Sequence, residues 1–250
     1  MGLDGLTPRM QMLSDLTPPS PLFDKPYRAL VLGARGAIGH AFVQAFRADA
    51  HCAHVEPVSR SGNGFDLLDA ASISDQAQRC QALGPFEVII DATGALTVEG
   101  VGPEKSLASI REEVLLRQFQ INAIGPLLAV RHFAPLLAPG PSIYAKLSAR
   151  VGSISDNQKG GWYGYRAAKA ALNMYLQTAA IELQRKNPEL RVVALQPGTV
   201  RSELSKMFSA SVPQLLEPQA SVAGMWSALR SLPVKAGASF IDHKGERIGW

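Results

Sequence analysis

The chain has few cysteines and no long apolar run, and these absences exclude several classes of protein. Cys52 and Cys80 are the only cysteines among its 250 residues, too few for a disulfide framework, so a reducing cytoplasm is expected. No apolar stretch reaches the roughly 18 residues that a membrane-spanning helix needs. The first residues are acidic and rich in proline where a signal peptide needs a basic start and an apolar stretch. We therefore expect a cytoplasmic protein without a membrane partner.

The chain also lacks any run of lysine or arginine, although its formal net charge is +4 and its pI is about 9.2. Proteins that bind nucleic acid concentrate their basic residues in patches or stripes. Here the basic residues are scattered, without interleaved aromatic side chains. The charge therefore indicates an ordinary solvated surface, and we expect neither a nucleic-acid partner nor a metal site.

The order of the predicted elements indicates an α/β fold. Residues 1–26 contain five prolines and no sustained period, so we interpret them as a flexible arm outside the fold. Strands and helices then alternate from residue 27 to residue 250, and the strands are apolar throughout. This pattern predicts a Rossmann-type doubly wound parallel sheet, in three layers and a single domain. Strands are expected at 27–32, 53–58, 64–68, 86–90, 142–147, 191–195 and 238–241. Helices are expected after the first strand and at 72–82, 103–110, 112–137, 162–184, 203–208 and 218–231.

A glycine-rich turn follows the first predicted strand directly. Gly33 permits a tight turn, Gly36 allows close approach of the backbone, and Gly39 lets the helix pack on the strand. A strand, a glycine turn and a helix in this order present backbone N–H groups to a phosphate. The second strand ends near Arg60, which suits a 2′-phosphate where an acidic residue would favour a ribose hydroxyl. Arg35 could contact the same phosphate, although both arginines could equally be solvated surface residues.

Tyr165 and Lys169 stand four residues apart in a segment that is expected to be helical, so both lie on one face, one turn apart. A neighbouring cation lowers the pKa of a phenol, as a general acid or base for carbonyl and alcohol chemistry requires. The same spacing also occurs where a lysine merely packs over an aromatic ring. Asn122 lies among apolar residues in the middle of a predicted helix, where asparagine is unfavourable unless it has a polar role.

The glycine turn, Asn122, a serine-containing loop, the Tyr165/Lys169 pair and the Pro197-Gly198 turn occur in this order. From about residue 27 to the C-terminus the chain resembles the short-chain dehydrogenase/reductase family. The segments SARVGSISDN and GGWYGYRAAKAALN are similar to the C-factor-like and sniffer-like carbonyl reductase branch of that family.

The resemblance implies a role for each matching residue. Tyr165 would donate a proton to a substrate carbonyl, and Lys169 would hold the nicotinamide ribose and lower the pKa of Tyr165. Asn122 would kink its helix and hold a water that links Lys169 to solvent. The positions expected to bind the cofactor are Gly33, Arg35, Gly36, Ile38, Gly39, Arg60, Asp66, Leu67, Ala92, Thr93, Gly94, Tyr165, Lys169, Pro197, Gly198 and Thr199.

The chain departs from the family pattern at several positions. Leu32 replaces the usual threonine before the glycine turn, and the usual middle glycine falls at Ala37. The segment Asp91-Ala92-Thr93-Gly94 replaces Asn-Asn-Ala-Gly.

The catalytic serine also departs from the pattern. The usual Ser-Ser pair aligns with Ser148-Ala149, as judged from Gly152, so the serine that normally does the chemistry is an alanine. Either Ser148 takes the role, or Ser153 does, or the site lacks its serine. We choose Ser148.

Two functions from different classes follow. The first is an NADP(H)-dependent oxidoreductase that interconverts a small-molecule carbonyl and an alcohol, with NAD also possible, acting as a homodimer or homotetramer. The second is a nucleotide-binding, C-factor-like signalling or regulatory protein with little turnover. Residues 202–218 are expected to close over the substrate with an apolar surface, or only to pack their own helix.

Overall fold

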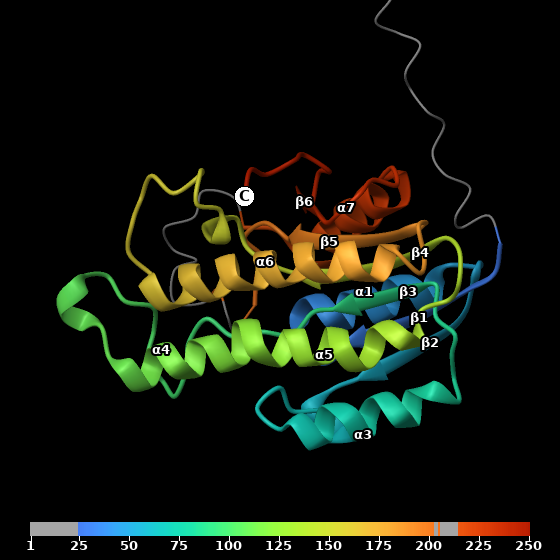
Figure 1. Cartoon of the computed structure of the whole chain (residues 1–250), viewed down its shortest axis with the longest axis horizontal. Helices are drawn as coiled ribbons and strands as arrows, with labels where there is room; N and C mark the ends of the chain where they lie inside the picture. The colour runs from blue at the N-terminus through green and yellow to red at the C-terminus, as the bar shows by residue number, and fades with distance from the viewer. Residues whose placement is uncertain (1–24, 203–204, 206–214) are drawn as a thin grey trace, which may run out of the picture.

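The computed structural model describes residues 25–202, 205 and 215–250 (Figure 1). Its described strands form one six-stranded sheet, all parallel, in the order β2-β1-β3-β4-β5-β6. The strands are β1 (Tyr27–Leu32), β2 (Cys52–Val58), β3 (Val88–Asp91), β4 (Ser142–Leu147), β5 (Leu190–Gln196) and β6 (Ser239–Asp242). Nearly every residue of β1 and all residues of β3 and β4 are buried, as expected for a parallel sheet that is covered on both faces.

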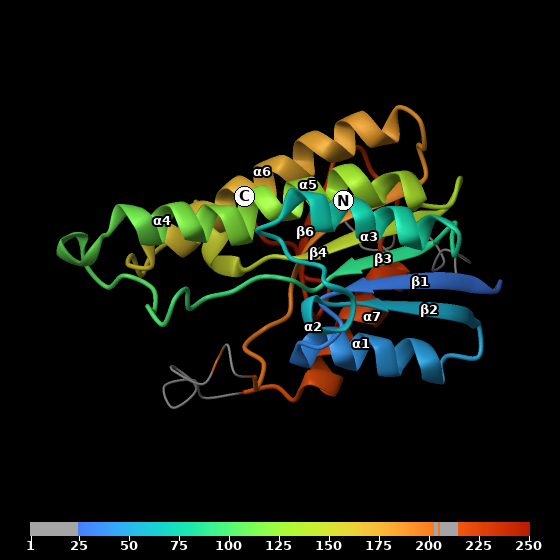
Figure 2. The ribbon, with the colours of Figure 1, turned by 90° about the horizontal axis from the view of Figure 1, so that it is seen from below.

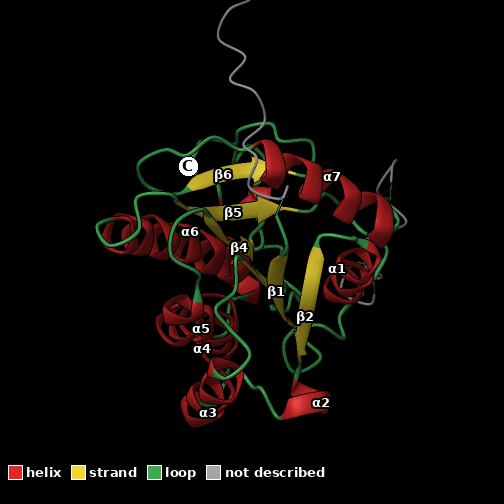
Figure 3. Cartoon of the chain, turned by 90° about the vertical axis from the view of Figure 1, so that its right-hand side faces the viewer, coloured by secondary structure: helices red, strands yellow, loops and turns green. Residues whose placement is uncertain are grey.

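Helices cover both faces of the sheet, so the predicted three layers are confirmed (Figures 2 and 3). One face carries α3 (Ala70–Gln81), α4 (Glu112–Phe119), α5 (Gly125–Phe133) and α6 (Tyr163–Gln184). The other carries α1 (Ala37–Ala48) and α7 (Pro218–Ser231). Each face has its own apolar core: Ile89 and Tyr144 pack in the layer of α5 and α6, and Ile90 packs in the layer of α1 and α7.

The strand predicted at 64–68 does not form. Gly64 has a φ of +76° and ends the short helix α2 (Arg60–Asn63), and the following residues make a turn. The predicted start of α3 was also wrong. Asp69, rather than Ser72, caps this helix by accepting a hydrogen bond from the Ala71 amide at 2.9 Å. The Ser72 hydroxyl instead accepts from the Asp66 amide at 2.9 Å and stabilises the turn that replaces the strand.

The long helix predicted at 112–137 is interrupted in its middle. A π-helical turn spans Gln120–Ile124 between α4 and α5, and a 3₁₀ turn at Ala134–Leu136 ends the segment. Pro126 has no amide hydrogen to donate to the carbonyl of Asn122, and the Gly125 amide donates to the Gln120 carbonyl five residues back. Asn122 therefore lies inside a widened turn rather than in a regular helix.

Two further expectations concern the loops. The helix expected at 103–110 is reduced to a 3₁₀ turn at Leu107–Ser109. Most of the helix expected at 203–208 and most of the expected substrate lid at 202–218 lie outside the described residues, as does nearly all of the N-terminal segment 1–26. Among the described helices, none is long and apolar enough to cross a bilayer.

Candidate active site

The predicted site residues gather at one edge of the sheet, where the strands end. Parallel strands have their carboxyl ends on the same side, and a doubly wound sheet has its crevice where the strand order reverses. In this chain the reversal lies between the neighbouring strands β1 and β3. The glycine turn follows β1, and the Asp91–Gly94 segment begins at the last residue of β3. The loops after β2, β4 and β5 open on the same edge.

The glycine turn has the geometry of a phosphate site. Gly33 adopts a φ of +79°, and a Cβ on Gly39 would lie 2.2 Å from the Gly33 carbonyl oxygen, so helix and turn pack too closely for a side chain. Gly36 is the N-cap of α1 and has no side chain with which to bond the amides of the first turn. Ile38, in that first turn, packs against the core. The backbone donors and the helix N-terminus thus fit a pyrophosphate.

Arg35, in the loop after β1, and Arg60, just after β2, lie in the same region of the sheet edge. Arg60 is the exposed first residue of α2, and Ser59 caps that helix by accepting from the Gly62 amide at 3.1 Å. A Cβ on Gly62 would lie 3.9 Å from the Arg35 Nε, which places the Arg35 guanidinium beside α2. The two cations therefore flank the turn at the ends of β1 and β2.

Tyr165 and Lys169 lie on one face of α6, as their spacing predicts. The Lys169 ammonium nitrogen is 5.6 Å from the centroid of the Tyr165 ring and donates to the Leu147 carbonyl at 3.1 Å. Both side chains are buried. From the chain's own groups, burial raises the pKa of Tyr165 above its ordinary value and lowers the pKa of Lys169 well below its ordinary value. Burial disfavours the phenolate, and the ammonium lies over the ring; the fall in the pKa of Tyr165 that the family resemblance attributes to Lys169 stays a prediction.

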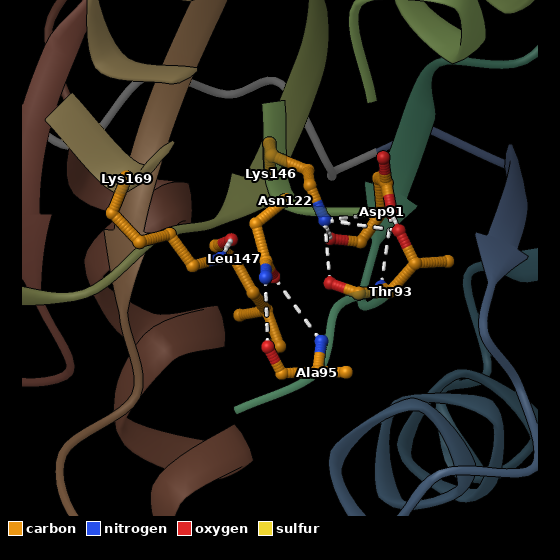
Figure 4. A network of polar contacts seen from close by, with 7 residues as sticks. All are labelled: Asp91, Thr93, Ala95, Asn122, Lys146, Leu147 and Lys169. Atoms are coloured by element: carbon orange, nitrogen blue, oxygen red, sulfur yellow. Dashed lines mark hydrogen bonds and ion pairs between the residues drawn. The ribbon is translucent and has the colours of Figure 1, made fainter. Parts of the chain in front are cut away.

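Asn122 is fully buried and its side chain is paired with one backbone segment. Its Oδ1 accepts from the Ala95 amide at 3.1 Å, and its Nδ2 donates to the Ala95 carbonyl at 2.7 Å (Figure 4). Nδ2 also donates to Gln118 Oε1 at 2.7 Å. Asn122 thus has the polar role that its apolar surroundings predict, which is to hold the loop after β3 against the π turn.

The serines of the loop after β4 are both buried and hydrogen-bonded. The Ser148 hydroxyl donates to Asn173 Oδ1 at 2.6 Å, and Asn173 lies on α6 two turns after Tyr165. The Ser153 hydroxyl accepts from the Asp156 amide at 3.1 Å and contacts the Ser155 hydroxyl. Ala149, the residue between them on the sequence pattern, is partly exposed. Neither serine carries a hydrogen bond to Tyr165 in the part of the chain that the structure describes.

The remaining predicted cofactor residues lie in the same loops. Asp66 accepts from the Leu68 amide at 3.0 Å, and Leu67 packs so closely on the long helix that a Cβ on Gly125 would lie 2.6 Å from its carbonyl oxygen. The Ala92 amide donates to the Leu32 carbonyl at 2.9 Å, which joins the loop after β3 to the glycine turn.

The turn after β5 is held by two neighbouring segments. The Pro197 carbonyl accepts from the Ser221 hydroxyl of α7 at 2.6 Å, and the Thr199 carbonyl accepts from the Leu216 amide at 2.9 Å. Between them Gly198 adopts a φ of +77°, and a Cβ there would lie 3.2 Å from the His243 ring. The turn expected at the nicotinamide end is thus rigidly placed at the same sheet edge.

Sequence reasoning missed two buried charges beside the site. Lys146, near the end of β4, forms an ion pair of 3.0 Å with Asp91, at the end of β3, and both side chains are completely buried. The lysine also donates to Thr93, at 2.6 Å to its carbonyl and at 3.0 Å to its hydroxyl. A lysine inside an otherwise apolar strand is the signal that could have identified this pair.

Glu104 was also missed, and it lies next to the start of α6. Its carboxyl Oε2 accepts from the Gly164 amide at 3.1 Å, one residue before Tyr165. Trp162, the N-cap of α6, has a φ of +55° and makes no cap bond through its own side chain. Glu104, distant in sequence, therefore does what a cap residue usually does.

Comparison with known proteins agrees with this geometry. Residues 27–212 match the short chain dehydrogenase family. The match spans well over half of the chain, so the protein belongs to this family, as its motifs indicate. It is an oxidoreductase of the short-chain dehydrogenase type, with a Rossmann-like fold.

Two individual proteins are similar to this chain over most of its length. The chain is 28% identical over 188 residues, 75% of this chain and 79% of the relative, to a 1-hydroxy-2-glutathionyl-2-methyl-3-butene dehydrogenase of Rhodococcus sp. (strain AD45). It is 32% identical over 169 residues to the C-signal protein of Myxococcus xanthus, covering 67% of this chain and 94% of that one. The latter confirms the predicted C-factor-like resemblance.

Solved structures share the fold at lower identity. The NADPH-bound carbonyl reductase from chicken fatty liver superposes with a TM-score of 0.74 and 21% sequence identity, covering 92% of this chain and 98% of that one. At this identity the similarity establishes the fold.

Proposed function

We propose that the protein is an NADP(H)-dependent reductase that interconverts a small-molecule carbonyl and its alcohol, with Tyr165 as the general acid or base. The observation that carries the proposal is the convergence of Tyr165, Lys169 and Asn122 at the sheet edge where the glycine turn also lies. The phenol and the ammonium come from α6, the Asn122 amide comes from the π turn, and the phosphate site lies between β1 and α1, so four separate elements contribute. A pair of residues that merely packed on a helix would not need this convergence.

The cofactor proposal rests on charge. Arg35 and Arg60 flank the turn after β1 and β2, and neither position carries an acidic side chain that would favour a ribose hydroxyl. NADPH is bound by a carbonyl reductase of the same fold. Gly33, Gly36 and Gly39 would hold the pyrophosphate, and residues 197–199 would lie at the nicotinamide end.

The reaction divides its steps between cofactor and protein. The nicotinamide, when bound, supplies or accepts the hydride. Because burial raises the pKa of Tyr165, the phenol is protonated near neutral pH and is ready to donate its proton to a carbonyl oxygen. Lys169, while charged, would bind the ribose hydroxyls and favour the phenolate that remains after proton transfer. Asn122 keeps the loop after β3 in place beside Lys169.

A second candidate function is nucleotide-dependent signalling on the same scaffold. The similarity to the C-signal protein and the alanine at position 149 favour it. The retained Tyr165/Lys169 pair favours chemistry, and we infer that turnover is the primary role.

The direct experiment is to titrate the protein with NADPH and NADH, and then to follow NADPH oxidation against a panel of aldehydes, ketones and quinones. The proposal expects preferential NADPH binding and turnover of at least one class of carbonyl compound. NADPH binding without turnover across the panel would favour signalling, and an absence of binding would contradict both functions.

A further inference from the structure

The buried ion pair between Lys146 and Asp91 lies directly behind the candidate active site. The two residues are opposite each other in the parallel pairing of β3 and β4. Asp91 is two residues after Ile89, and Lys146 is two residues after Tyr144; both of these apolar residues pack in the layer of α5 and α6. Because side chains alternate along a strand, the ion pair faces the same layer, which carries Asn122 and Lys169.

The hydrogen bonds of the pair converge on one short segment. Lys146 has three N–H donors, and its nitrogen contacts Asp91 Oδ1 at 3.0 Å, the Thr93 carbonyl at 2.6 Å and the Thr93 hydroxyl at 3.0 Å. Asp91 Oδ1 also accepts from the Thr93 amide at 3.0 Å and from the Thr93 hydroxyl. Thr93 is thereby fixed at its amide, its carbonyl and its side chain.

The fixed segment continues into the active site. A Cβ on Gly94 would lie 3.0 Å from Asn122 Oδ1 and 3.6 Å from the Lys169 ammonium nitrogen. The next residue, Ala95, makes both of its backbone hydrogen bonds to the Asn122 side chain. In Figure 4 Lys146 contacts Thr93, and Asn122 contacts Ala95. Gly94, between these two residues, brings the same segment close to Lys169.

We propose that Lys146, together with Asp91, is a positioning residue that holds residues 93–95 against Asn122 and Lys169. A buried ion pair is a weak way to join two strands, since apolar side chains of similar volume do so at least as well. The pair is better explained by what it orients. This inference rests on the proposed function in one respect, because it takes Lys169 as the residue that binds the cofactor ribose.

The substitution Lys146→Met tests the positioning role, because methionine retains much of the length of the side chain but loses the ammonium. Once residues 93–95 are released, NADPH affinity should fall about tenfold, the size expected when one member of a contacting network is removed. The matched control is Ile89→Ala, a fully buried residue on the same face of β3. It should lower the melting temperature and leave NADPH affinity unchanged.

The pH dependence separates this role from a purely structural one. The titratable groups that face Lys169 are Tyr165 on its own helix, Lys146 on β4 and Asp91 on β3. Burial and then Lys146 lower the pKa of Lys169, whereas Asp91 raises it. NADPH affinity should fall with rising pH as Lys169 loses its proton. Lys146→Met should raise the pKa of Lys169 and move that fall to higher pH, whereas Ile89→Ala should not move it.

The Lys169 Nζ resonance, titrated by NMR in the protein without cofactor, provides a readout that does not depend on the proposed function. If the wild type fails to bind NADPH, the proposed function fails, and this titration still decides the present inference. A Lys146→Met protein with the wild-type titration of Lys169 would overturn it. If that variant does not fold, Lys146→Gln, which keeps a polar end and the Asp91 carboxylate but loses the charge, should raise the pKa of Lys169 in the same way. An unchanged titration there would also overturn it.

Discussion

The buried Ser148 hydroxyl donates a 2.6 Å hydrogen bond to Asn173, which lies on α6 two helical turns after Tyr165. The serine that aligns with the first position of the family's Ser-Ser pair is therefore tied to α6. The partly exposed residue of the pair is Ala149. Neighbouring residues of an extended segment point to opposite sides, so the hydroxyl of Ser148 and the methyl of Ala149 face different ways.

This relationship predicts that Ser148→Ala mainly lowers stability. The substitution leaves Asn173 Oδ1 buried without its donor, which should cost about 1–3 kcal/mol of unfolding free energy. Denaturant unfolding measures that loss. Turnover should change less than tenfold, since the hydroxyl is occupied elsewhere. Ala149→Ser, which restores a hydroxyl on the exposed side, should raise turnover. A loss of turnover in Ser148→Ala of the size expected for a catalytic group, about 10²–10⁴-fold, would instead assign it the carbonyl-orienting role.

Cofactor choice should depend on the two arginines beside the glycine turn. A charge-assisted arginine–phosphate contact is worth roughly 1.5–3 kcal/mol, so Arg60→Ala should weaken NADPH binding about ten- to a hundredfold and leave NADH binding nearly unchanged. Arg35→Ala should have the same selectivity with a smaller effect. Isothermal titration with both cofactors measures the ratio. Equal weakening for NADPH and NADH would show that neither arginine reads the 2′-phosphate.

Glu104 should act on Tyr165 through the start of α6. Glu104→Ala removes the acceptor of the Gly164 amide and should cost about 1–2 kcal/mol of stability, as the loss of a helix cap does. Turnover should fall as well, because Tyr165 is the next residue. Glu104→Gln keeps an acceptor at the same place and should restore most of both losses. Equal defects in the two variants would mean that the cap bond is not what matters.

We expect the chain to associate through the outer surface of α4 and α6. Met174 and Ile181 on α6 and Leu116 on α4 are exposed apolar residues, with Met174 at 64% and Leu116 at 59%, and Ile124 in the adjoining π turn is exposed as well. An isologous contact is the usual arrangement for homodimers. Light scattering should give a multiple of 26.8 kDa, and Met174→Glu/Ile181→Glu should give the monomer mass. Val234→Glu, an exposed apolar residue elsewhere, is the control. A wild-type monomer at micromolar concentration would contradict the expectation.

The sequence predicted correctly those strands and helices whose sequence pattern depends mainly on which residues are buried. The bounds of β1, β4 and α7 were correct to the residue, because their apolar runs are bounded by turn residues, charged residues or proline. The strand predicted at 64–68 was wrong because Gly64 ends a helix and the Ser72 hydroxyl bonds to the following turn. The spacing of apolar residues along the sequence does not reveal such local contacts.

The residues of the candidate site likewise fall into those that the sequence predicted and those that it missed. Spacing along one helix placed Tyr165 and Lys169 together, and apolar neighbours pointed to a role for Asn122. Lys146 and Glu104 were missed because their partners, Asp91 and Gly164, are 55 and 60 residues away in sequence. The burial of the Tyr165 phenol, which raises its pKa, was not predicted, because it depends on tertiary packing.

The central claim is that Tyr165 supplies the proton for carbonyl reduction. The most direct test is the rate of NADPH oxidation with a carbonyl substrate of the wild type, measured for Tyr165→Phe alongside its NADPH affinity. Phenylalanine keeps the ring and loses only the hydroxyl, so turnover should fall about 10²–10⁴-fold or more while the affinity for NADPH stays close to that of the wild type. A Tyr165→Phe protein that turns over the same substrate at the wild-type rate would contradict the assignment.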